Sequence, residues 1–135
     1  MAKTKQLTIA VNHQPGAVAR IAKTLGDAKV NILCLLGTSQ GTAGTLQLIV
    51  EDARRAKKAL DAAKISYQET PAEQYELPNK AGSLAECLNQ FAAKGVNMNS
   101  ICAMAAKGGK KAVVVCTVDA APKAAAKAAT ATATA

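Results

Sequence analysis

The sequence predicts an α+β protein in which antiparallel sheets carry helices on one face, and it predicts this arrangement twice. Stretches that alternate polar and apolar residues, as half-buried strands do, are interspersed with stretches whose apolar residues recur at helical spacing. The stretch Asn12–Ile32 also has a counterpart 66 residues later. The matched positions are Gly16 with Gly82, Val18 with Leu84, Ile21 with Cys87, Leu25 with Phe91, Val30 with Val96 and Asn31 with Asn97. A repeat of this length is one supersecondary unit used twice.

The first copy opens with an alternating strand over Gln6–Val11, in which every second residue is apolar. Pro15 cannot donate to a sheet ladder, so the strand must end before it. Gly16 has no Cβ, which permits a tight turn and the close approach of another group. The helix that follows carries an apolar stripe of Val18, Ile21, Leu25 and Ala28.

The rest of the first copy predicts three strands and a second helix. Val30–Leu36 is almost wholly apolar, as a central strand is, and Thr45–Val50 alternates again. Gly37–Gly44 between them predicts a hairpin with a long, mobile connection. Asp52 can cap the next helix, and Ile65–Gln68 returns as a fourth strand. The order β-α-β-β-α-β is a ferredoxin-like sandwich with two helices on one face of an antiparallel sheet.

The second copy repeats this order. Its first helix should carry the stripe Leu84, Cys87, Leu88 and Phe91. Strands are expected over Asn97–Ala105 and Lys111–Val118, with a shorter connection than in the first copy. Asp119 is expected to cap a last helix that ends near Ala129. Residues 130–135 fall where the last strand belongs. Their threonines favour a strand and their alanines bury little, so a degenerate edge strand and a disordered tail both stay open.

These motifs resemble the start of an ACT domain in both copies. The resemblance rests on a strand, a D-x-P-G-like turn, a helix of the form G-x-[LV]-A-x-[IL], and then V-N-[IM]. It implies two tandem ACT domains, residues 1–70 and residues 71–135, and ACT domains often sense amino acids. The acidic residue common in the turn of the family is replaced here by His13 and Asn79, and Ala81 replaces the proline of the second turn.

The turn Gln14–Ala17 suits the carboxylate of a free amino acid. It exposes backbone N–H groups at a helix N-terminus, which carries partial positive charge. Asn31 can both donate and accept hydrogen bonds, which suits the ammonium and the carboxylate together. ACT domains that bind amino acids commonly hold them between two modules, near this turn and this asparagine. The resemblance therefore implies the ligand-binding residues His13, Gln14, Gly16, Ala17 and Asn31 in the first copy, and Asn79, Lys80, Gly82, Ser83 and Asn97 in the second. The structural alternative is that the glycines serve backbone geometry and the asparagines form turns.

Other chemistry finds little support in the composition. The chain has one histidine and no evident Ser-His-Asp set, so we expect no enzymatic activity. Its four cysteines form no C-x-x-C pair and favour buried, reduced thiols, so we expect no metal site and no cofactor. No apolar run is long enough for a membrane span, and no signal segment opens the chain, which favours a cytoplasmic protein.

The net charge of +8 raises one alternative, a basic ferredoxin-like protein that binds nucleic acid. The fold is shared with RNA-recognition modules, but those modules need exposed aromatic residues on the central strands. Only Tyr67, Tyr75 and Phe91 are aromatic here, and the expected central strands offer aliphatic residues and cysteines instead. Nucleic acid is therefore an unlikely partner.

The expected partners are a free amino acid, a second copy of the chain and a regulated protein. We expect no attached catalytic domain, so any signal is expected to pass to a separate enzyme or transcription factor. Each half is too small to bury a large core, and sheet edges invite pairing, so we expect a homodimer joined through sheet edges or helix faces.

Overall fold

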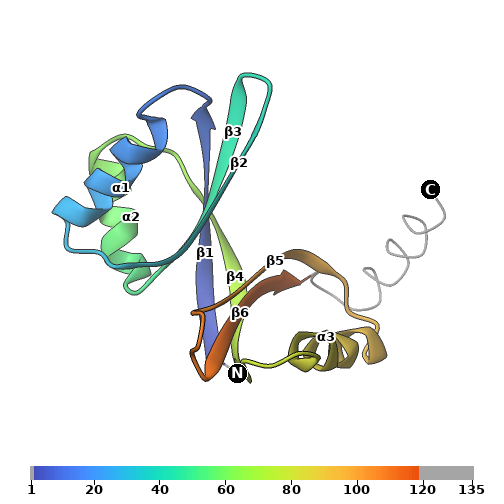
Figure 1. Cartoon of the computed structure of the whole chain (residues 1–135). Coiled ribbons are helices and arrows are strands. Elements are labelled where there is room, and N and C mark those ends of the chain that lie inside the picture. The colour runs from blue at the N-terminus through green and yellow to red at the C-terminus, as the bar shows by residue number, and fades with distance from the viewer. Residues whose placement is uncertain (1, 119–135) are drawn as a thin grey trace. The chain divides into compact units, whose positions relative to one another are not determined.

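The computed structural model describes residues 2–118, which form six strands and three helices. The described chain divides into two compact units, one of Thr4–Pro71 and one that begins at Ala72 and also takes in Lys3. Figure 1 shows the elements of each unit. The helix predicted to follow Asp119 and the predicted tail, residues 130–135, lie outside the described residues.

The first unit has the predicted βαββαβ order. Its elements are β1 (Ala2–Asn12), α1 (Ala17–Asp27), β2 (Ile32–Gln40), β3 (Ala43–Val50), α2 (Ala53–Ala62) and the start of β4 (Gln68–Pro78). The strands lie side by side in the order β2-β3-β1-β4, and β3 is antiparallel to both of its neighbours. Both helices lie on the same side of these strands (Figure 1). The predicted fold class is therefore confirmed.

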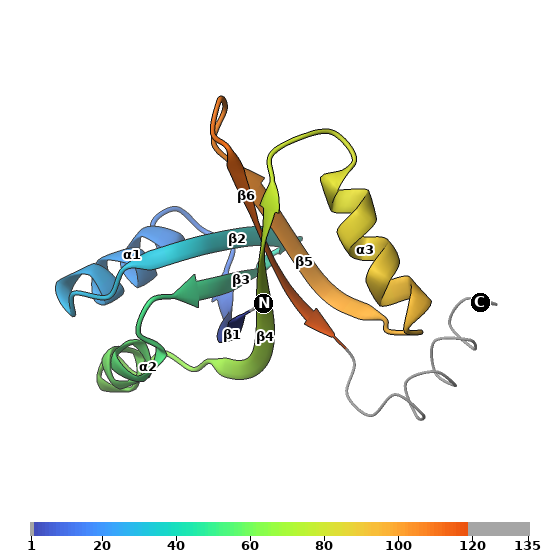
Figure 2. The ribbon, with the colours of Figure 1, turned by 90° about the horizontal axis from the view of Figure 1, so that it is seen from below.

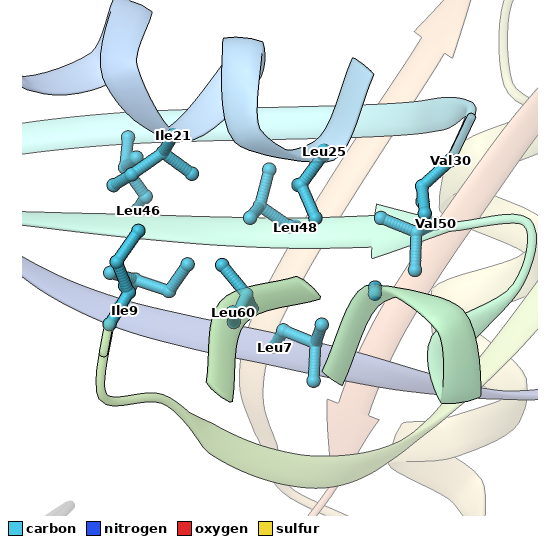
Figure 3. Close-up of a cluster of buried hydrophobic side chains, with 11 residues drawn as sticks. Leu7, Ile9, Ile21, Leu25, Val30, Leu46, Leu48, Val50 and Leu60 are labelled. Atoms are coloured by element: carbon cyan, nitrogen blue, oxygen red, sulfur yellow. The ribbon is translucent and has the colours of Figure 1, made fainter. Parts of the chain in front are cut away.

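The core of the first unit lies between the two helices and the sheet (Figure 3). The period-2 alternation of β1 and β3 directs the apolar side chains of both strands towards the helices. They meet the stripe of α1 and the buried face of α2. The largest buried members of this cluster are Leu7, Ile9, Leu25, Leu46, Leu48 and Leu60. Burying each such side chain stabilises the fold by about 1.5–3 kcal/mol.

The apolar strand β2 lies at the edge of the sheet, so the prediction that Val30–Leu36 forms a central strand is wrong. Val30 is buried but precedes β2, whereas Leu33 is 51% exposed and Leu36 is also exposed. An apolar run in the sequence indicates that a strand has apolar surface to bury. It does not indicate whether other elements of the same chain cover that surface. In the described structure β2 presents apolar surface that no other element covers.

The two hairpin connections reverse the predicted lengths. β2 continues to Gln40, which pairs with Ala43, so only Gly41 and Thr42 form the first turn. The predicted long, mobile loop is wrong because the polar residues before Gly41 continue the strand. The second connection is the longer one: β5 (Met98–Ala105) and β6 (Lys111–Val118) are joined by the five residues 106–110.

The helix starts follow two different designs. Asp52 caps α2 as predicted, because its side chain accepts a hydrogen bond of 3.0 Å from the backbone N–H of Arg55. Before α1 and α3 (Ser83–Ala93) the N-cap is a left-handed glycine without a side-chain cap, Gly16 (φ 86°) and Gly82 (φ 90°). These two turns therefore leave helix N–H groups for another acceptor.

The three described helices end in one common motif. The residue after each C-cap is left-handed: Lys29 (φ 61°), Lys64 (φ 58°) and Gly95 (φ 68°). The following N–H then donates to the last helical turn, as Ile65 does to the carbonyl of Leu60 at 2.9 Å. This is the Schellman motif, whose left-handed position favours glycine. The predicted fourth strand over Ile65–Gln68 is wrong at its start, because Ile65 belongs to this motif and β4 begins at Gln68.

The second unit arranges its strands in the order β4-β6-β5, with α3 against the sheet (Figure 2). Strand β6 has the predicted bounds. Cys87 of α3 and Cys116 of β6 are buried, and the rings of Tyr75 and Phe91 meet edge to face at 5.5 Å between centroids. The first residue of each predicted helix stripe is more exposed than expected, with Val18 at 42% and Leu84 at 40%.

Candidate functional site

Backbone hydrogen bonds fix the conformation of the turn between β1 and α1. The N–H of His13 donates to the carbonyl of Thr42 at 2.9 Å, which ties this turn to the tip of the β2–β3 hairpin. The N–H of Ala17 donates to the carbonyl of Gln14 at 3.3 Å. The next two N–H groups, those of Val18 and Ala19, have no acceptor within the helix. They form the part of the turn that can receive an anion.

Two open hollows lie beside this turn, both within the first unit. The smaller, about 220 Å³, lies toward β2 and is bordered by His13, Gln14, Ala17 and Val18 together with Thr38 and Ser39. The larger, about 650 Å³, lies toward the residues that follow α2. It is bordered by Gln14, Gly16, Ala17 and Arg20 together with Lys64 and Ser66. Gln14 and Ala17 therefore border both hollows.

Asn31 lies at the other end of α1 from the turn. It is exposed, and its backbone carbonyl accepts a hydrogen bond of 3.0 Å from Glu51. The 11 residues of α1 separate it from Gly16 by roughly 16 Å along the helix. One unit thus brings His13, Gln14, Gly16 and Ala17 together but does not bring Asn31 to them.

The second turn repeats the backbone pattern of the first. The N–H of Asn79 donates to Lys110 at 2.9 Å, and that of Ser83 donates to Lys80 at 3.3 Å. Asn97 is exposed and follows α3, so the length of the helix separates it from Gly82, as Asn31 is separated from Gly16.

The side chains of the second turn differ from those of the first. The side-chain amide of Asn79 donates to the carbonyl of Gly109 at 2.8 Å and holds the longer hairpin connection. The Oγ of Ser83 is buried without a hydrogen-bond partner, and the side chain replaces the methyl group of Ala17. Lys80 is exposed. Asn79 therefore has a structural task that His13 does not share.

The two helix starts also differ in charge. The first turn of α1 contains no acidic residue, whereas α3 carries Glu86 in its first turn. A carboxylate at that position offsets the partial positive charge of a helix N-terminus. The first turn is therefore the more favourable place for an anionic group.

Two cations that border the larger hollow were not predicted as site residues. Arg20 lies outside the apolar stripe predicted for its helix, and Lys64 had no predicted role. Their spacing along the chain carries no local signal, because they come to border one hollow only through the packing of α1 and α2. Helix periodicity alone could have located Lys64 at the end of α2, but not beside the turn.

Two further titratable groups among residues 2–118 have shifted pKa values because they are buried. Burial raises the pKa of the Cys116 thiol. Burial also raises the pKa of Tyr75, whose hydroxyl donates to Glu73 at 2.8 Å. Across residues 2–118 no three histidine, cysteine or acidic residues gather as metal ligands would. None of the described helices is long and apolar enough to cross a membrane.

The α+β sandwich and the glycine turns that open α1 and α3 define the class of ACT domains. The sequence matches the ACT domain pair over residues 2–130, and the chain belongs to that family. Protein BT0572 from Bacteroides thetaiotaomicron has a similar structure, with a TM-score of 0.80 and 25% identity over 93% of this chain and 85% of that one. The regulatory subunit of aspartate kinase from Thermus thermophilus, in its ligand-free form, has a TM-score of 0.66 and 16% identity over 96% and 95% of the two chains. No curated protein sequence matches.

Proposed function

We propose that this chain is a regulatory protein that binds a free amino acid at its glycine turns and acts on a separate protein. The observation that carries the proposal is the first turn, where the helix start with the open N–H groups of Val18 and Ala19 borders a hollow of about 220 Å³ through Ala17 and Val18. The similarity to a regulatory subunit of aspartate kinase supports a regulated enzyme as the partner, and a transcription factor is the alternative.

The ligand is held between two modules. The turn of one module receives the carboxylate, and Asn31 or Asn97 of another module accepts a hydrogen bond from the ammonium. This division follows from the length of α1, which keeps Asn31 away from Gly16 within one unit. The exposed apolar side chains of Val18 and Leu33 support a second module that covers the smaller hollow. Val18 of α1 borders this hollow, and Leu33 belongs to β2, whose residues Thr38 and Ser39 border it.

The proposal includes a homodimer in the cytoplasm and no catalysis by this chain. The unpaired edge of β2 and its exposed leucines support pairing with a second copy. We retain residues 1–70 and residues 71–135 as the two ACT domains of the proposal, and their boundary falls within β4.

The experiment is calorimetry and thermal shift with the twenty amino acids. Loss of a charge-assisted hydrogen bond costs about 1.5–3 kcal/mol, so Asn31→Ala or Asn97→Ala should weaken binding about ten-fold or more. Asn89→Ala is the matched control, because Asn89 is exposed on α3 and is not one of the residues proposed to bind the ligand. If no amino acid stabilises the protein, or if the control weakens binding equally, the proposal is wrong.

Gly16→Val needs its own control, because this substitution changes the backbone of the turn as well as the space beside it. Gly16 has φ 86°, so a branched side chain strains the turn even without a ligand. Gly108, with φ 79° in the second hairpin connection, supplies a control for strain because a Cβ added at either position would meet no atom within 4 Å. Lower affinity in Gly16→Val but not in Gly108→Val supports ligand approach at the first turn.

A further inference from the structure

The larger hollow of the first unit has an apolar floor and a cationic rim. Ile9, Ile21 and Ile65 contribute to its lining, and Arg20 and Lys64 contribute the charged side chains. None of the described residues that line it is acidic. Its volume of about 650 Å³ falls within the range of roughly 300–1,000 Å³ that is typical of small-molecule sites.

The two rim cations lack the partners that neighbouring cations have. In the same unit Lys23 pairs with Asp27 at 2.8 Å, and Lys57 pairs with Glu69 at 2.9 Å. Among residues 2–118, Arg20 and Lys64 form no such ion pair. Two cationic residues therefore border one hollow, and neither forms an ion pair with the described chain. A ligand that supplies negative charge would give both cations a partner.

Lys64 also occupies a backbone position that favours glycine. Its φ of 58° is the left-handed conformation of the Schellman motif, and Gly95 holds the same position after α3. A lysine therefore lines the hollow at a position where its backbone conformation is costly. Lys29 has the same conformation after α1 and does not line the hollow, so strain alone does not identify Lys64. Lys64 is identified by three features together: its left-handed backbone, its place in the lining of the hollow, and the lack of an ion-pair partner among residues 2–118.

We infer that this hollow binds a small molecule that carries two negative charges on one or two groups, a dicarboxylate or a phosphomonoester. Arg20 offers a planar set of donors that matches a carboxylate or phosphate, and Lys64 offers a second cation. The isoleucine floor receives the carbon chain of the ligand. The larger hollow shares Gln14, Gly16 and Ala17 with the residues proposed for amino-acid binding. It is distinguished from the smaller hollow by Arg20 and Lys64, which do not line the smaller one.

The test is calorimetry on the full chain at low salt with succinate, glycerol 3-phosphate and acetate. We expect saturable binding of succinate or glycerol 3-phosphate and at least ten-fold weaker binding of acetate. Which of the two dianions binds more tightly distinguishes the dicarboxylate from the phosphomonoester. Arg20→Gln and Lys64→Gly should each reduce affinity about ten-fold, as the loss of one charge-assisted contact does.

Two variants control for the net charge and for the backbone change. Lys23→Gln removes an exposed cation from the same helix as Arg20, and Lys29→Gly removes a lysine from the same left-handed position as Lys64. Both should leave affinity unchanged. If they weaken binding as much as Arg20→Gln and Lys64→Gly, the anion is attracted by diffuse charge only and the inference is overturned. It is equally overturned if neither dianion binds.

A failure of this inference can be told from a failure of the amino-acid proposal. Asn31 does not line the larger hollow, so Asn31→Ala should leave dianion binding unchanged while it weakens amino-acid binding. Thermal unfolding of each variant checks its fold. Lys64→Gly relieves a left-handed lysine and should not lower the unfolding temperature, so a loss of affinity in this variant cannot be attributed to misfolding.

Discussion

Two glycine substitutions in one helix should change stability in opposite directions. Gly16 is the left-handed N-cap of α1, and Gly26 lies in the last turn of the same helix with an ordinary helical backbone. A Cβ added at either position meets no atom within 4 Å. Packing therefore cancels from the comparison, and only the backbone conformation distinguishes Gly16→Ala from Gly26→Ala.

The expected magnitudes follow from the conformational preferences of alanine. At Gly16 alanine must adopt a left-handed conformation, so the free energy of unfolding should fall by about 1–2 kcal/mol. At Gly26 alanine loses less conformational entropy on folding than glycine does, so the free energy of unfolding should rise by about 0.5–1 kcal/mol. The two variants should differ by about 2 kcal/mol, although both add one methyl group to the same helix.

Urea and thermal denaturation followed by circular dichroism measure this difference. A change of 1 kcal/mol corresponds to about 4–8 °C in Tm for a unit of this size. Equal stability of the two variants would refute the left-handed cap, and with it the open N–H groups on which the amino-acid proposal depends. Gly82→Ala should reproduce the loss seen for Gly16→Ala, because Gly82 caps α3 with a φ of 90°.

Four further outcomes are expected. Leu60→Ala should lower the free energy of unfolding by about 2–5 kcal/mol in urea denaturation, since Leu60 has no exposed surface, whereas Leu84→Ala at a 40% exposed position should cost well under half of that. The hydrogen bond from Lys57 lowers the pKa of Glu69, so this pair stabilises the fold above about pH 4.3 and its contribution is lost as pH falls through the lowered pKa. Glu69→Gln should therefore differ from the unmodified protein in thermal melts near neutral pH and converge with it in acid. Sedimentation at tens of micromolar should show a dimer, and Leu36→Lys at the exposed edge should favour the monomer; a monomer before substitution would contradict edge pairing. Binding to nucleic acid should vanish near physiological salt, and tight, sequence-dependent binding there would favour the alternative function.

Periodicity predicted the core well because burial in the first unit follows local geometry. Leu46 and Leu48 lie on one face of a strand by a period of 2, and Ile21 and Leu25 lie on one face of a helix by their spacing of four. These residues are indeed among the buried cluster of Figure 3. Position within the sheet was predicted poorly, because the exposure of Leu33 depends on which strands pair and not on its own neighbours in sequence.

The candidate site was also predicted only in part from the sequence. The turn at Gly16 is a local structure, and proline followed by glycine was enough to predict it. The separation of Asn31 from that turn depends on the direction of α1, and the placing of Arg20 and Lys64 at one hollow depends on packing between α1 and α2. Such arrangements bring together residues that are distant in sequence, so no motif signals them.

Strand β4 has a practical consequence for anyone who wishes to study the two halves apart. Its 11 residues, Gln68–Pro78, run from one unit into the other without an intervening linker. A fragment that ends at residue 70 keeps only three residues of this strand, and one that starts at residue 71 lacks them. Each fragment would be left with an incomplete sheet whose edge has unpaired backbone N–H and C=O groups, and such an edge is prone to aggregation. Single substitutions in the intact chain are therefore the safer means of separating the two sites.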